Sequence, residues 1–266
     1  MKKYSVLQNK YTLPTIILLL LLSTDIFLNQ GMTRFLLPEN FPDRIVPQII
    51  NPVKATLVAQ GIHWKKAVNS KEAMAALPAT VAGFEVDVYF DTTINGFYVY
   101  HDSTQLSTQR LDGLLGIYKQ NKLTASVWLD FKNLSAANEQ PSLLYLLKLR
   151  EQFSLHNKII VESTAPQYLQ SFNQSNLFTS YYTPFFNPYT IGEEVLKIYA
   201  DSISSTLKKY NVAALSGYYF QVPALKKYFP SYPLLSWSAP KRFSLISFLF
   251  HIKLERAYSP KVLLFP

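Results

Sequence analysis

Gly83-Phe-Glu-Val-Asp-Val-Tyr-Phe-Asp91 is the most informative stretch of this 266-residue chain. Its apolar residues alternate with the others, which is the period of a β-strand. Side chains two apart on a strand point the same way, so Glu85 and Asp87 place two carboxylates on one face. Adjacent carboxylates repel and each is costly to bury, and a divalent cation with oxygen ligands relieves both problems. The alternative is a half-exposed strand with its acidic face in water.

Short apolar runs alternate with helical patterns from residue 55 to the end of the chain. We expect strands at 55–63, 83–91 (followed by a short run at 96–101), 125–132, 158–163, 177–182, 211–216, 233–237 and 261–265. The helical segments between them are expected at 70–77, 106–120, 136–153, 166–172, 191–210 and 222–229, and an apolar stretch at 243–252 precedes the last strand. This order predicts an α/β fold, a (β/α)8 TIM barrel over 55–266. A doubly wound open sheet is the alternative. Such a sheet requires a glycine-rich turn after its first strand, and Gly61 is the only glycine near the first predicted strand.

The N-terminal part has the pattern of a targeting segment. Residues 1–11 are short and basic, 12–30 are mostly apolar, and 31–54 form a proline-containing linker. We predict that 12–30 form a transmembrane or signal helix, an uncleaved signal anchor in preference to a cleaved signal peptide. Because the basic side precedes it, the barrel is expected on the extracytoplasmic side, membrane-anchored, or secreted if the segment is cleaved.

Composition narrows the functions further. Hydrophobic residues make up 48% of the chain, and charged residues 16%, which is enough apolar material for a sizeable core. The absence of cysteine excludes disulfides, thiolate metal sites and a cysteine nucleophile. The net charge of +9 suits a membrane surface, a phosphate-bearing substrate or nucleic acid. The chain has no arginine-rich run, so we do not expect nucleic acid as its partner.

Polar residues gather where the predicted strands end, the edge at which TIM barrels place reactive groups. His63 closes the first predicted strand, His101 closes the run after the second, and Asp130 and Lys132 end the third. Each has an ordinary alternative: a loop or capping histidine, or an ion pair on an exposed face. Trp237, near the end of the seventh strand, is a candidate for substrate contact, with a core or rim aromatic as the alternative.

Together these residues describe one chemistry. Glu85, Asp87 and Asp130 would form an all-oxygen site suited to Ca²⁺ or Mg²⁺. Lys132 can neutralise a phosphate oxygen, and two histidines can serve as base and acid. Metal, lysine and paired histidines predict cleavage of a phosphodiester, with electrostatic stabilisation of its transition state.

The motifs resemble those of the glycerophosphodiester phosphodiesterase family, of the phospholipase-C-like phosphodiesterase superfamily of TIM barrels. Glu85-Val-Asp87, His101-Asp102 and Leu129-Asp-Phe-Lys132 are similar to its E-x-D, H-D and L-E-x-K motifs. The resemblance implies that the three carboxylates hold the metal, that His63 and His101 are the acid/base pair, and that Lys132 contacts phosphate.

The chain departs from the family in three places. His63-Trp64-Lys65 stands for His-Arg-Gly, so Lys65 is the expected substitute for the phosphate-binding arginine, without its bidentate fork. Asp130 stands for glutamate, and the insertion after His-Asp is missing. His63-Trp-Lys-Lys-Ala-Val-Asn69-Ser70 followed by Glu85-Val-Asp87 is also similar to the H-x-x-N-S and E-x-D pattern of the menorin-like branch, which adds Asn69 as a substrate-side residue.

We therefore predict a metal-dependent phosphodiester hydrolase that acts on a small phosphodiester or lipid head group. One alternative is a catalytically inactive barrel that binds an anionic ligand or a surface partner, which the missing arginine and insertion favour. A nuclease of the same superfamily, prompted by the positive charge, is the third.

Overall fold

The computed structural model describes residues 11–39, 41–58, 61–101, 108–238 and 243–266, and the chain forms two compact units. One unit comprises residues 1–40 and 240–257, and the other 41–239 and 258–266. We expected the barrel to begin at residue 55 and to contain all of the chain after it. The residues of the predicted linker from Phe41 onward instead belong to the barrel unit, and most of one late helix belongs with the N-terminal segment.

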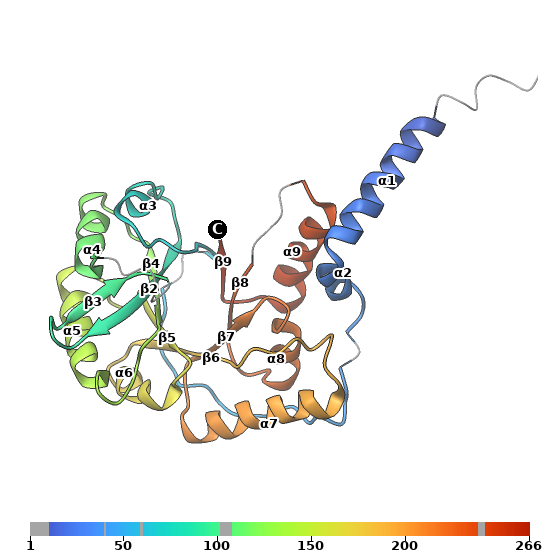
Figure 1. Ribbon diagram of the computed structural model, residues 1–266. Helices are drawn as coiled ribbons and strands as arrows, with labels where there is room; N and C mark the ends of the chain where they lie inside the picture. Colours follow the sequence, from blue (N-terminus) through green and yellow to red (C-terminus); the bar gives the residue numbers. More distant parts are fainter. Residues whose placement is uncertain (1–10, 40, 59–60, 102–107, 239–242) are drawn as a thin grey trace, which may run out of the picture. The chain divides into compact units, whose positions relative to one another are not determined.

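Eight parallel strands form the barrel (Figure 1). They are β1 (His63–Lys65), β2 (Gly83–Asp91), β4 (Ser126–Phe131), β5 (Ile159–Ser163), β6 (Phe178–Tyr182), β7 (Ala214–Tyr218), β8 (Leu234–Trp237) and β9 (Val262–Phe265). Because β1 pairs with both β2 and β9, the sheet closes on itself, which confirms the TIM-like barrel and excludes the open sheet. The strand β3 (Gly96–Val99) pairs antiparallel with β2, outside the parallel ring.

Helices follow most strands and cover the outside of the barrel (Figure 1). They are α3 (Lys71–Ala75), α4 (Leu111–Gln120), α5 (Glu139–Gln152), the short 3-10 turn η2 (Pro166–Tyr168), α6 (Gln170–Gln174), α7 (Glu193–Lys209) and α8 (Val222–Tyr228). Ser70 caps α3, since its hydroxyl accepts a hydrogen bond from the Ala73 amide. The predicted helix 106–120 is described only from residue 108, and its helical part starts at Leu111.

The first strand differs from our prediction of 55–63. Residues 55–58 belong to no strand, and the first strand is the three-residue β1. The Val58 amide donates to the carbonyl of Asn157 at 2.7 Å, and Ala55 and Leu57 pack against the barrel core. The apolar run at 55–58 therefore covers the start of the barrel strands instead of forming one of them.

The barrel interior is filled by alternate residues of each strand. Trp64, Trp128 and Leu264 belong to the buried cluster inside the ring. Gly83 precedes the acidic pair on β2 and lies against the Trp64 indole. A Cβ at Gly83 would fall 2.1 Å from a ring carbon of Trp64, so only glycine lets the indole pack there.

The N-terminal unit contains α1 (Thr12–Leu28), α2 (Gln30–Leu36) and most of α9 (Leu245–Tyr258). The Asp25 carboxylate of α1 accepts hydrogen bonds from the Asn29 amide group at 2.8 Å and the Ile246 backbone N–H at 3.0 Å. No helix within the described ranges is long and apolar enough to cross a membrane, so the predicted transmembrane segment is not supported.

Candidate active site

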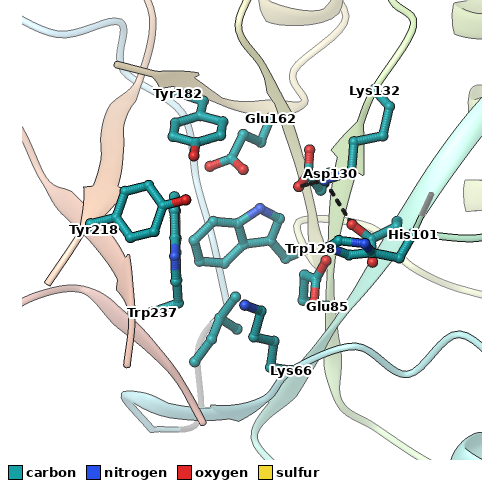
Figure 2. Close-up of a pocket in the computed structure, with 12 residues that line it drawn as sticks. Lys66, Glu85, His101, Trp128, Asp130, Lys132, Glu162, Tyr182, Tyr218 and Trp237 are labelled. Atoms are coloured by element: carbon teal, nitrogen blue, oxygen red, sulfur yellow. Dashed lines mark hydrogen bonds and ion pairs between the residues drawn. The ribbon is translucent and has the colours of Figure 1, made fainter. Parts of the chain in front are cut away.

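A cavity of about 170 Å³ opens where the barrel strands end (Figure 2). All of its lining residues belong to the barrel unit. They are Lys66, Glu85, Asp87, His101, Trp128, Asp130, Lys132, Glu162, Tyr182, Tyr218, Trp237 and Leu264. The strands place these side chains in the cavity because consecutive inward positions on one strand are two residues apart.

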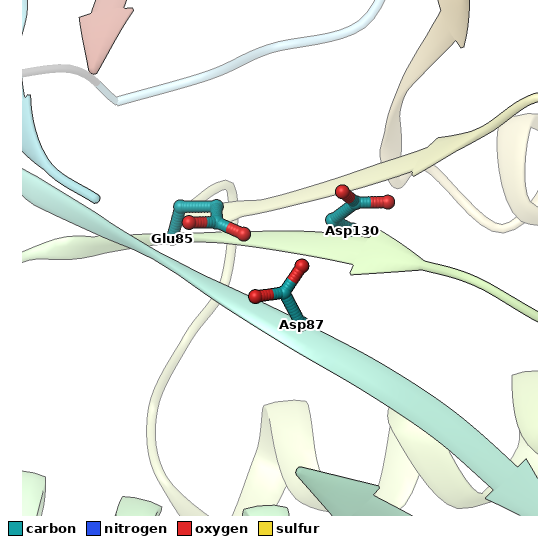
Figure 3. Close-up of side chains that lie close together, drawn as sticks. All are labelled: Glu85, Asp87 and Asp130. Atoms are coloured by element: carbon teal, nitrogen blue, oxygen red, sulfur yellow. The ribbon is translucent and has the colours of Figure 1, made fainter. Parts of the chain in front are cut away.

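Three carboxylates meet at one side of the cavity (Figure 3). Glu85 and Asp87 come from β2 and Asp130 comes from β4, where Asp130 is the register partner of Asp87. Each offers an oxygen atom, and the three atoms lie within 4.8 Å of one another. The prediction that Glu85, Asp87 and Asp130 come together is confirmed in geometry, whereas their role as metal ligands stays a prediction.

Neighbouring groups fix the orientation of this cluster. Glu85 accepts a hydrogen bond from the Ala67 amide at 2.7 Å. Asn69 donates to the Asp87 carboxylate at 2.6 Å and accepts from the Asp87 amide at 2.9 Å. Lys132 forms ion pairs with Asp87, at 2.8 Å, and with Asp130. Asn69 therefore positions a carboxylate, and it is not among the residues that line the cavity, where we expected it to contact substrate.

The electrostatics of the cluster favour a cation. Burial, followed by the neighbouring Asp87 carboxylate, raises the pKa of Glu85 to about 8. Burial also raises the pKa of Asp130, although Lys132 opposes the shift. Burial works against the charge of Lys132, but Asp130 and Asp87 outweigh it and raise the pKa of the ammonium. One lysine thus faces three carboxylates, a donor set of hard oxygen atoms that fits Ca²⁺ or Mg²⁺.

The opposite side of the cavity is aromatic. Tyr182, Tyr218 and Trp237 lie at the ends of β6, β7 and β8, and we call these three residues the aromatic end (Figure 2). Burial, together with a hydrogen bond to Tyr218, raises the pKa of Tyr182. Glu162, on β5, lies between this end and Asp130, and burial raises its pKa well above the ordinary value.

The structure brings most but not all of the predicted residues together. His101, Lys132 and Trp237 line the cavity with the carboxylates. His63 and Lys65 do not; they are exposed on the outer side of β1 and line a different pocket against α3. Trp64 pairs with Leu264, whose side chain points into the barrel, so Trp64 points inward as well. Because side chains alternate along a strand, the odd-numbered positions of β1 point outward. Asp102 of the H-D motif lies outside the described residues.

Sequence reasoning missed Lys66, Tyr182 and Tyr218. Lys66 follows β1 in the inward position that we had given to Lys65, and its ammonium lies 6.0 Å from the centre of the Trp237 ring. The two tyrosines end strands in which Ser180 and Ser216 hold the preceding inward position. This alternation can be recognised in the sequence once it is known whether the odd or the even positions of a strand point into the barrel.

Comparisons with known proteins agree with the fold. No protein-family model matches the chain, and no curated protein does. A solved structure from Silicibacter pomeroyi, assigned as a glycerophosphoryl diester phosphodiesterase, matches with a TM-score of 0.55 at 13% identity, over 80% of this chain and 91% of that one. A glycerophosphodiester phosphodiesterase from Parabacteroides distasonis matches at 0.52 and 13%, over 81% and 94%.

A third match is a phosphodiesterase from Oleispira antarctica, solved with the product sn-glycerol-3-phosphate. Its TM-score is 0.51 at 10% identity, over 77% of this chain and 92% of that one. The chain therefore shares the barrel fold of glycerophosphodiester phosphodiesterases, as the sequence motifs suggested. The branch within the superfamily is not resolved, so the menorin-like likeness stays a prediction.

Proposed function

We propose that this chain is a metal-dependent phosphodiester hydrolase. The observation that supports the proposal best is the group of three carboxylates within 4.8 Å of one another, set in the cavity at the barrel edge. The likeness in fold to phosphodiesterases agrees with it. The donor set fits Ca²⁺ or Mg²⁺, and a cation would offset the repulsion from Asp87 that, together with burial, raises the pKa of Glu85.

The roles of the residues follow from their contacts. A divalent cation held by Glu85, Asp87 and Asp130 would draw negative charge from the phosphodiester as its bond to the leaving group breaks. Lys132 is engaged with two of these carboxylates and keeps them in place. Lys66 extends into the same cavity and makes no ion pair with any described residue, so it supplies the positive charge that contacts phosphate.

Proton transfer rests on His101 in this proposal. It is the histidine that lines the cavity within the described residues, whereas His63 lies on the outer side of β1. A pair of histidines acting as acid and base is therefore not what the described geometry favours. His101 would accept the proton of the attacking oxygen or return it to the leaving one.

Hydrolysis of bis-p-nitrophenyl phosphate by the purified full-length chain tests the proposal. Activity should require Ca²⁺, Mg²⁺ or Mn²⁺, be abolished by EDTA, and fall about 100-fold or more in His101→Ala. His63→Ala is the matched control and should keep the rate of the unchanged protein. If a folded protein shows no metal-dependent hydrolysis, or if His101→Ala keeps full activity, the assignment is wrong.

A barrel that binds an anion without turnover is the second candidate. The position of His63 favours it, because the expected partner of His101 is absent from the described lining. The two candidates differ in one result. Both predict that a phosphodiester binds and stabilises the protein, but the second predicts that bound phosphodiester is recovered intact.

Membrane attachment, with the barrel on the extracytoplasmic side, is a further part of the proposal. It is supported by α1, whose Leu13, Leu20 and Phe27 side chains are 66%, 62% and 69% exposed. An exposed apolar surface of this kind is typical of a site that contacts a membrane or another protein. Carbonate extraction and protease protection of cells producing the full chain test it: recovery in the soluble fraction would contradict the attachment.

A further inference from the structure

The helix α9 carries apolar side chains on two of its faces. One face is packed, and its buried residues are Ser247, Phe250, His251 and Leu254. On another face Leu245, Phe248 and Leu249 are 48%, 61% and 40% exposed. Their spacing of three and four residues places them side by side along the helix, and we call these three residues the apolar stripe of α9. Exposed apolar side chains that lie together mark a contact surface, so we expect the stripe to have a partner.

Contacts within the N-terminal unit hold α9 in one rotation about its axis. At its start, the Ile246 backbone N–H donates to the Asp25 carboxylate of α1 at 3.0 Å. Near its end, the Lys253 ammonium donates to the Phe35 carbonyl at 2.6 Å and forms an ion pair with Glu39, also at 2.6 Å. All of these residues belong to the same unit. The apolar stripe therefore cannot exchange places with the packed face unless these contacts break.

The position of Asp25 fixes where along α1 the stripe lies. Asp25 is the only acidic residue between residues 11 and 38, and a carboxylate is costly within hydrocarbon. Its contact with Ile246, together with the hydrogen bond from Asn29 to the Ser244 hydroxyl at 3.2 Å, places the first turn of α9 beside the end of α1 (Figure 1). A membrane that takes up α1 would therefore have its surface at the level of the stripe.

The charge of the N-terminal unit favours lipid over a second protein copy as the partner. Its two segments, residues 1–40 and 240–257, contain eight lysines and arginines but only three acidic residues. Leucine and phenylalanine on one helix face with basic residues around them are typical of helices that lie in a membrane interface. A second copy of this chain would bring like charges together, whereas anionic head groups attract them.

We propose that the apolar stripe of α9 lies in the interface of an anionic lipid bilayer, as a second membrane contact beside α1. The last helix of the barrel sequence thus serves the N-terminal unit as a membrane-binding element. This inference rests on the membrane attachment proposed above for α1 and does not depend on the phosphodiesterase activity.

Because the chain has no cysteine, a fluorophore can be attached to one chosen position of the full-length protein. Phe248→Cys is labelled with the polarity-sensitive dye NBD and mixed with vesicles of phosphatidylglycerol and phosphatidylcholine in equal parts. A lipid with a nitroxide near the head-group end of its acyl chain should quench this label by about half or more, since interfacial helices lie at that depth. Leu144→Cys, at a leucine of α5 that is 65% exposed, is the matched control and should not be quenched. Absence of quenching at position 248 would overturn the proposal.

A label in α1, at Phe27→Cys, separates the two membrane contacts. Quenching at position 27 without quenching at 248 refutes the stripe and leaves the attachment by α1 supported, whereas quenching at neither position refutes both. Quenching at 248 alone supports the stripe and refutes the attachment by α1. A label at 248 that brightens with protein concentration but is not quenched by the nitroxide lipid would assign the stripe to a second copy and overturn the proposal.

Thermal unfolding supplies a readout that a packing role would change. Phe248→Ser should melt at the temperature of the unchanged protein, because the Phe248 side chain lies on the exposed face of α9. A clear fall in the melting temperature would show that Phe248 packs against the protein and would overturn the proposal.

Discussion

Replacing Glu85 by glutamine separates the electrostatic cost of the carboxylate cluster from its shape. Glutamine keeps an acceptor for the Ala67 amide, which lies 2.7 Å from the carboxylate in the unchanged protein. It mimics the protonated acid and never ionises. If Glu85 is held neutral by burial and by Asp87, the variant should be the more stable protein at alkaline pH when no metal is present.

The size of this difference in stability follows from the raised pKa of Glu85. Glu85 has a pKa of about 8 in the folded chain, whereas the ordinary pKa of a glutamate side chain is 4.5. Between these values the native state retains a proton that the unfolded state has lost, so stability falls as pH rises and levels off above pH 8. The total loss is on the order of 5 kcal/mol, and Glu85→Gln does not suffer it. For a domain of this size the gap in melting temperature would reach roughly 10–20 °C.

Thermal unfolding in EDTA from pH 5 to pH 9 measures this gap directly. The two proteins should melt together near pH 5 and diverge in favour of Glu85→Gln as the pH approaches 8. Adding Ca²⁺ or Mg²⁺ should stabilise the unchanged protein most at high pH, because the ligand must be deprotonated, and should do little for the variant. The exposed Glu151→Gln is the control. A constant gap across this pH range would refute the reasoning.

Three further substitutions probe the packing and the two lysines. Gly83→Ala should lower stability by about 1–3 kcal/mol in chemical denaturation, because its Cβ would collide with the Trp64 ring. Lys132→Met should lower the melting temperature in EDTA and make stability depend on added Ca²⁺ or Mg²⁺, because Asp87 and Asp130 lose their counter-ion. Lys66→Met should leave that melting temperature unchanged and raise the KM for a phosphodiester about tenfold, as expected when a charged contact to substrate is lost.

The acidic pair and its partner could be predicted because two independent patterns agree. Alternation on β2 sets Glu85 and Asp87 on one face whatever the neighbouring strands do. Asp130 joins them because β4 runs parallel to β2, in the register that opposes Asp130 to Asp87. A strand-end position in a barrel was enough to expect this convergence, so the carboxylate cluster was predictable from local pattern and fold class together.

The first strand could not be predicted in the same way, because β1 has three residues and too short a pattern to show its period. The apolar run at 55–58 has the composition of a strand but covers the beginning of β4 and β5, through Val58 and Asn157. Which face of β1 turns inward is decided by its pairing with β9, two hundred residues away in the chain. His63, which was expected in the site because it closes a predicted strand, therefore lies on the outer side of β1, and Lys66 was not among the predicted residues.

The two lysines of the cavity have different roles in the proposed function. Lys132 is bound to two carboxylates, so it cannot follow a substrate without leaving them uncompensated. Lys66 extends from the end of a short strand and is restrained by no ion pair to the described residues, so it can move to an incoming anion. An arginine would offer two fixed donors, whereas lysine offers a mobile point charge.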